Sequence, residues 1–144
     1  MPPIRLDQVN LIAQDVGASR TFYARLGLDF GDLSDPVWAD HHVSAEQGEH
    51  PGIDLDIDST SFVHKLDAGW PGGPGVVIGF KVDSRQEVDA LVATLAAAGV
   101  HVQQEPFDAF WGARYVVVSD PDGNGVGIMS PLDPATRSES PSPT

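Results

Sequence analysis

Three aspartates occupy alternate positions in one short segment, where Asp54, Asp56 and Asp58 alternate with aliphatic residues. Because successive side chains of a β-strand point to opposite faces, a strand here places all three carboxylates on one face. Such carboxylates could pair with an organic cation. Asp54 or Asp56 could also act as a general base if burial raised its pKa. The alternative is a solvated strand face, which we prefer for Asp58 at the strand end and leave open for the other two.

Two uncharged amides, Gln8 and Asn10, share a face of another predicted strand, opposite Val9 and Leu11. Amides that line a pocket can donate and accept hydrogen bonds to a ligand. Simple cross-strand hydrogen bonding is the equally weighted alternative.

Aromatic residues could supply the walls of the same pocket. Trp38 lies in a predicted strand, and Phe110, Trp111 and Tyr115 lie close together in the second half. Aromatic faces beside carboxylates suit a flat, positively charged molecule through stacking and ion pairing. Packing in the core is the alternative for each ring. Trp70 lies in a Gly/Pro-rich segment, where we expect it to be a flap over the pocket or a dimer contact.

The histidines do not form a recognisable metal-binding pattern. His41 and His42 are adjacent on a predicted strand, so their side chains point to opposite faces and cannot both enter one site. His50 and His64 fall in predicted loops, and His101 follows a predicted helix. We therefore expect surface or hydrogen-bonding histidines.

Composition narrows the classes of function. The chain has 144 residues, with 41% hydrophobic residues and 8 basic against 21 acidic residues, a formal charge of −13. This balance argues against nucleic-acid and anionic-membrane partners, because both need a cationic face. The sequence has no cysteine, which excludes disulfides and thiolate chemistry. No apolar run approaches the ~20 residues that span a bilayer, so a cytoplasmic location is expected.

The strands and helices that must position these residues occur in the same order in the two halves of the chain. The first half predicts a strand over 6–12, a helix that Asp15 caps and Gly27 ends, and strands over 28–33, 37–43 and 52–58. The second half predicts a strand over 75–82, a helix from a Ser84–Glu87 capping box to Gly99, and strands over 100–102, 113–119 and 125–129.

These segments define an α+β chain of two βαβββ units, over about 5–58 and 75–130. Residues 59–74 are expected to be a linker. Residues 131–144 are rich in Ser and Pro and are expected to be a disordered tail.

Two segments carry a resemblance to a known superfamily. One is Gln8–Asp15 running into Phe22–Leu28, and the other is Phe110–Tyr115 followed by Asp120-Pro121-Asp122-Gly123-Asn124. On these motifs the chain resembles the vicinal oxygen chelate superfamily, which includes glyoxalases, bleomycin-resistance proteins and extradiol dioxygenases. The resemblance implies a cup-shaped sheet made of the two units, and a homodimer. It does not by itself fix an activity.

The resemblance also implies where a divalent metal would bind. The four ligand positions of the metal-dependent members fall on Gln8, Asp54, Val77 and Gly127. Val and Gly side chains cannot ligate a metal, and two oxygen donors fall short of the three or four that a catalytic site needs. We therefore expect no metal and no cofactor. On the same reasoning Gly79 and Gly127 leave volume for a ligand, and Lys81 pairs with a carboxylate of the pocket.

The function that these features favour is binding of a small molecule. The guest would be a cationic or aromatic compound such as an antibiotic, held in a pocket formed by Gln8, Asn10, Trp38, Asp54, Asp56, Phe110, Trp111 and Tyr115. The main alternative is an enzyme, either a metal-independent isomerase, cyclase or lyase with Asp54 or Asp56 as its base, or a metal-dependent relative. A protein–protein interaction module is the third class, and it would need an exposed apolar patch.

Overall fold

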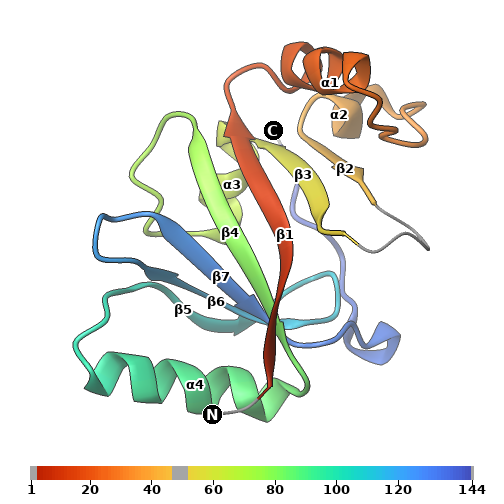
Figure 1. Cartoon of the computed structure of the whole chain (residues 1–144). Coiled ribbons are helices and arrows are strands. Elements are labelled where there is room, and N and C mark those ends of the chain that lie inside the picture. The colour runs from red at the N-terminus through yellow and green to blue at the C-terminus, as the bar shows by residue number, and fades with distance from the viewer. Residues whose placement is uncertain (1–2, 47–51, 144) are drawn as a thin grey trace.

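The computed structural model describes residues 3–46 and 52–143, which form one mixed β-sheet with helices on its two faces (Figure 1). The strands lie in the order β2-β3-β1-β4-β7-β6-β5. Their bounds are β1 Ile4–Ala13, β2 His42–Ala45, β3 Asp54–Ser59, β4 Gly75–Val82, β5 Val102–Asp108, β6 Arg114–Ser119 and β7 Gly125–Met129. The predicted α+β fold is confirmed.

The helices are α1 (Val16–Arg25), α2 (Pro36–Ala39), α3 (Thr60–Leu66) and α4 (Arg85–Ala97), and a short 3-10 helix covers Pro134–Thr136. Asp15 caps α1 by accepting a hydrogen bond from the Ala18 amide at 2.9 Å, as predicted. At α4, Ser84 Oγ accepts from the Glu87 amide, and Glu87 accepts from the Asp83 amide rather than from that of Ser84. No helix among the described residues combines the length and the apolar character needed to cross a membrane.

Helices α1 and α4 cover one face of the sheet, and α3 covers the other. The core under α4 includes Val82 and Val88, and the core under α1 includes Ala13 and Ile57. Ile12, Val63 and Val77 form a third core, and the strand residues among them point to the opposite face. Figure 1 shows α1 and α4 near opposite ends of the sheet.

The predicted strand over 28–33 is wrong, so the part of the chain that the structure describes forms a sheet of seven strands rather than eight. The Gly31 amide donates to the Asp29 carboxylate and the Ser34 amide to that of Asp32. Gly31 also has a φ of +69°. Such side-chain to backbone bonds compete with strand pairing. The strand predicted over 37–43 is likewise replaced by α2, which Asp35 caps, followed by β2.

The predicted linker at 59–74 contains α3. Ser59 accepts a hydrogen bond from the Phe62 amide, which caps the helix, and Phe62 and Val63 are buried. Trp70 is neither a flap nor exposed for a dimer contact, because it is only 8% exposed and belongs to the core with Ile12 and Val77. A Cβ atom at Gly75 would come within 2.9 Å of the Trp70 ring, so glycine is what allows this packing.

The tail predicted to be disordered makes defined contacts through residue 143. The Asp133 amide donates to the Gly112 carbonyl at 2.8 Å, and the Ser138 amide to the Phe110 carbonyl at 3.0 Å. Near its end, Pro143 is buried and its carbonyl accepts from Ser61 of α3. Backbone hydrogen bonds to a loop and a helix thus hold a segment whose composition is poor in apolar residues.

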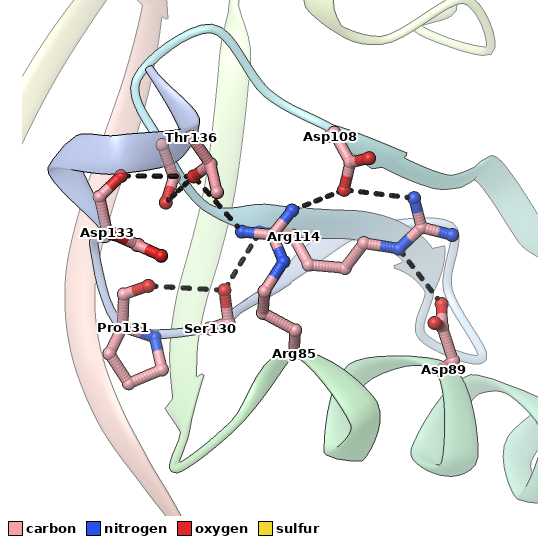
Figure 2. A network of polar contacts seen from close by, with 9 residues as sticks. Arg85, Asp89, Asp108, Arg114, Ser130, Pro131, Asp133 and Thr136 are labelled. Carbon is pink, nitrogen blue, oxygen red and sulfur yellow. Dashed lines mark hydrogen bonds and ion pairs between the residues drawn. The ribbon is translucent and has the colours of Figure 1, made fainter.

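Ion pairs tie the β5–β6 hairpin to α4 (Figure 2). Asp108 at the end of β5 binds both Arg85 and Arg114, and Arg114 also binds Asp89 of α4 at 3.1 Å. Arg85 reaches Thr136 of the tail as well. The loop between β5 and β6 is therefore fixed from two sides, and this loop carries Phe110 and Trp111.

Candidate functional site

A cavity of about 280 Å³ lies on the sheet face that α3 covers. Its floor comes from the central strands, and its walls come from α2, α3, the β5–β6 loop and the start of the tail. The lining residues are Gln8, Asn10, Trp38, His42, Asp56, Asp58, Phe62, Val63, Leu66, Asp67, Val77, Phe110, Trp111, Tyr115, Met129 and Leu132.

A continuous run of aromatic rings forms the wall. Trp38 contacts Phe62 with ring centroids 5.2 Å apart, and Phe62 contacts Phe110 at 6.3 Å. The run continues from Phe110 to Trp111 at 5.1 Å and from Trp111 to Tyr115 at 5.5 Å. Edge-to-face and tilted contacts of this kind hold the rings in fixed orientations.

The polar end of the cavity is a chain of three side chains from three neighbouring strands. Asn10 of β1 donates from Nδ2 to Asp58 Oδ2 at 2.9 Å, and Asp58 Oδ1 bonds His42 Nδ1 of β2. The register aligns His42 directly opposite Asp58. The Asp58 side chain is 5% exposed and that of His42 is 38% exposed, so the chain runs from the protein interior to an accessible ring.

Charge and burial act on His42 in opposite directions. Its burial among rings disfavours the imidazolium, but the hydrogen bond and charge of Asp58, with the charge of Asp56 added, outweigh it and raise the pKa of His42 above its ordinary value. Because Asp58 holds Nδ1, Nε2 is the nitrogen that remains for a ligand.

Asp56 lies beside this chain as a half-buried carboxyl group. Ser44 Oγ donates to Asp56 Oδ1 at 2.5 Å, and the register places Asp56 next to Asn10. Burial raises the pKa of Asp56 to about 6, against the hydrogen bond from Ser44 and the charge of His42, which lower it. The group therefore changes charge near pH 6.

A second buried carboxyl group, Asp67, lies at the end of α3. Gln103 donates to it at 2.5 Å and the Gly69 amide at 3.1 Å, yet burial raises its pKa. Burial, with the charges of Asp67 and Asp58 added, also raises the pKa of Tyr115, so its hydroxyl keeps its proton. The cavity thus combines aromatic walls with carboxyl groups and neutral donors.

The structure brings together most of the side chains that the sequence singles out. All of the predicted ligand-binding residues except Asp54 line the cavity, and Asp58, assigned to a solvated face, is buried and lines it too. Asp54 shares the strand face but lies beyond the cavity edge. Lys81 pairs with Asp7 at 3.7 Å rather than with a pocket carboxylate. Whether these residues bind a ligand stays a prediction.

Sequence reasoning missed several lining residues. The sequence predicts a surface or hydrogen-bonding histidine at position 42, and the bond to Asp58 agrees with this, but the sequence does not predict that His42 lines the cavity. Helix α3 falls in the segment predicted to be a linker. A signal for α3 was present, because Ser59 is a good capping residue that precedes the apolar pair Phe62-Val63. The pairing of His42 with Asp58 depends on strand register, which no local pattern reveals.

The expectation that Gly79 and Gly127 leave ligand volume is wrong. A Cβ atom at Gly79 would come within 2.6 Å of Gln8 Cγ, and one at Gly127 within 2.6 Å of the Tyr115 hydroxyl. The side chains of Gln8 and Tyr115 therefore fill the space above these glycines.

The residues present do not fit a divalent metal. Val77 and Gly127 supply no ligand atom, and Tyr115 occupies the space that a side chain at position 127 would need. Within residues 3–46 and 52–143, no group of three or more His, Asp or Glu side chains is arranged to hold an ion.

Solved structures show the same fold. A protein named NAD-dependent benzaldehyde dehydrogenase from Legionella pneumophila shares 19% identity over 91% of this chain and 100% of its own, with a TM-score of 0.65. The Mn(II)-bound glyoxalase from Novosphingobium aromaticivorans shares 24% over 87% of this chain and 38% of its own, with a TM-score of 0.59. An extradiol ring-cleaving dioxygenase from B. fuscum shares 19% over 92% and 34%, with a TM-score of 0.64.

These identities establish the fold alone, and the chain spans only about a third of the glyoxalase and the dioxygenase. No curated protein matches the sequence. The family model of the Glyoxalase/Bleomycin resistance protein/Dioxygenase superfamily matches residues 5–128. The chain belongs to this superfamily.

Proposed function

We propose that this protein binds a small, flat, positively charged organic molecule in the cavity. The observation that carries the proposal is the placement of Asp56 and Asp58 at the end of an aromatic box. A cation near a ring face gains about 0.5–2 kcal/mol, and more when it is also paired with a carboxylate away from water.

The volume of the cavity limits the size of the guest. At about 280 Å³ it falls just below the ~300–1,000 Å³ typical of pockets for drug-sized ligands, so a molecule of one or two fused rings fits best. An antibiotic that carries such a ring system belongs to this class. We also propose, from the family resemblance, a homodimer with one cavity per subunit.

Two probes of matched shape test the role of charge. N-methylquinolinium is a flat cation, and quinoline is its neutral counterpart at pH 8. We expect the cation to bind the wild-type protein at least tenfold more tightly by calorimetry. Equal affinity for the two compounds would contradict the proposal.

Two neighbouring aspartates provide a matched pair of variants. Asp56→Asn removes a carboxylate inside the cavity, and Asp54→Asn makes the same change just outside it. We expect the first to abolish the preference for N-methylquinolinium and the second to leave it intact. An equal loss in both variants would show that only the overall negative charge of the protein attracts the cation.

A metal-independent enzyme is the second candidate function. The observation that favours it is the pKa of Asp56, which burial raises to about 6, because a general base works best when its pKa lies near the working pH. The names of the structural neighbours include a glyoxalase and a dioxygenase, which keeps an enzymatic role among the proposals.

A further inference from the structure

The connected side chains Asn10, Asp58 and His42 form an arrangement that stoichiometric binding does not need. A cation site made of carboxylates and aromatic rings does not need both oxygens of a buried carboxylate to be bound by other side chains, as those of Asp58 are. Asn10 fixes one oxygen of Asp58, and Asp58 fixes one nitrogen of His42. This is how a carboxylate orients an imidazole for proton transfer at its other nitrogen.

The surroundings of His42 favour this use. The ring lies edge-on to Trp38 of α2, with centroids 6.3 Å apart, and 6.0 Å from Phe62 of α3. These neighbours carry no charge, and the charged groups that act on His42 are Asp58 and Asp56 of β3. The imidazole thus has a fixed orientation, a cavity in front of it and carboxylates that stabilise its protonated form.

We propose that His42 is a general base that removes a proton from a carbon atom of the bound molecule, with Asp58 and Asn10 as positioning residues. The proposal goes beyond binding but rests on it, because the substrate must occupy the same cavity.

The carboxylates restrict the class of substrate. Two negative groups beside the guest disfavour an anionic product of proton loss. A cationic carbon acid, such as a ring with an alkyl group next to a positively charged nitrogen, avoids this cost because it becomes neutral. In the step, Nε2 takes the proton and the C–H electron pair forms a C=C bond to the ring. The ring nitrogen gains an electron pair and loses its charge. Return of a proton from the imidazolium to carbon completes the cycle without a co-reactant.

The probe 1,2-dimethylquinolinium tests this step directly. Its 2-methyl protons exchange with deuterium when a base removes and returns them, and proton NMR in D₂O follows the loss of the methyl signal. At saturating probe, we expect the His42→Gln variant to exchange about a hundredfold more slowly than the wild type, in line with the usual contribution of a general base.

Two controls separate this role from general damage. His41 is next in sequence but bonds Ser59 outside the cavity, so His41→Gln should exchange at the wild-type rate. Calorimetry with N-methylquinolinium should show that His42→Gln still binds, which reports an intact cavity. Failure of the wild type to bind either cation overturns both proposals, whereas binding without exchange overturns only this one.

The pH profile identifies the base. The wild-type exchange rate should rise with pH to a plateau, with an inflection above the ordinary histidine value of about 6.5. Asp58→Asn should move this inflection to lower pH, because it removes the carboxylate that favours the imidazolium. If His42→Gln retains the rate at saturating probe and Asp56→Asn loses it, Asp56 is the base and the proposal is wrong.

Discussion

The hydroxyl group of Tyr115 stands 2.6 Å from the point that a Cβ atom of Gly127 would occupy. Two atoms of the Tyr115 ring also lie within 3.1 Å of that point, so rotation of the hydroxyl alone would not make room. The tyrosine on β6 and the glycine on β7 therefore depend on each other, and Tyr115 can contact Trp111 and line the cavity because position 127 has no side chain.

Replacing Gly127 with alanine should displace Tyr115. We expect a loss of about 2 kcal/mol in the free energy of unfolding by urea, the usual cost of adding a methyl group to a filled site. Gly125→Ala is the matched control, because its Cβ atom would lie 3.2 Å from Val77 and should cost less than half as much. Equal losses in the two variants would show that Tyr115 is not the obstacle.

Replacing Asp56 with asparagine should stabilise the protein at alkaline pH. Burial raises the pKa of Asp56 from 3.8 to about 6, so the folded state binds its proton more tightly and loses stability as pH rises through this window. The shift corresponds to at most roughly 3 kcal/mol. Asp56→Asn should therefore gain up to this amount at pH 8 and nothing below pH 4. Thermal unfolding across this range measures it, and a constant difference at all pH values would contradict it.

The His42–Asp58 pair should stabilise the fold more in acid than in alkali. The pKa of His42 is raised in the folded state, so the stabilisation is complete below the unfolded value of about 6.5 and is lost as pH rises through the folded value. The loss in the free energy of unfolding caused by His42→Gln should be larger at pH 5.5 than at pH 9, as measured by urea unfolding at both values. The same cost at both values would mean that the charged pair contributes no stability.

Removal of the tail after Pro131 should loosen the aromatic wall. The tail holds the β5–β6 loop through its bonds to Phe110, Trp111 and Gly112, and Leu132 lines the cavity. We expect the truncated chain to melt at a lower temperature and to bind N-methylquinolinium at least tenfold more weakly. Binding at full strength after truncation would show that the loop keeps its position without the tail.

Much of the fold could be predicted because its elements carry local signals. The strand over 125–129 and the strand over 75–82 match the sequence prediction, and Asp15 and Ser84 cap their helices as expected. The sequence predicts a strand over 28–33, but the Asp29 and Asp32 side chains accept hydrogen bonds from the backbone there. The glycines that follow α3 favour a loop, although Ser59 begins a helix there.

Only part of the candidate site could be predicted, because its residues come together through the pairing register of the strands and through elements that pack above the sheet. Alternation placed Asp54, Asp56 and Asp58 on one face, and the structure agrees, yet the cavity reaches only the last two. Where it ends depends on α3 and the tail, which lie above the sheet. The pairing of His42 with Asp58 needs β2 and β3 to be antiparallel neighbours in one register. Neither the end of the cavity nor the register of β2 with β3 can be predicted from the spacing of residues along the chain.

The contact of the tail with α3 has a practical consequence for anyone who labels or purifies this protein. Ser142 and Pro143 bond Lys65 and Ser61 through their carbonyl oxygens, on the helix that forms one wall of the cavity. An affinity tag fused after residue 144 would compete with these bonds, and we expect it to lower the measured affinity. A fluorophore attached there would instead report changes at that wall. A tag before β1 is the better choice, because Figure 1 shows that strand beginning near α4, on the far side of the sheet from α3.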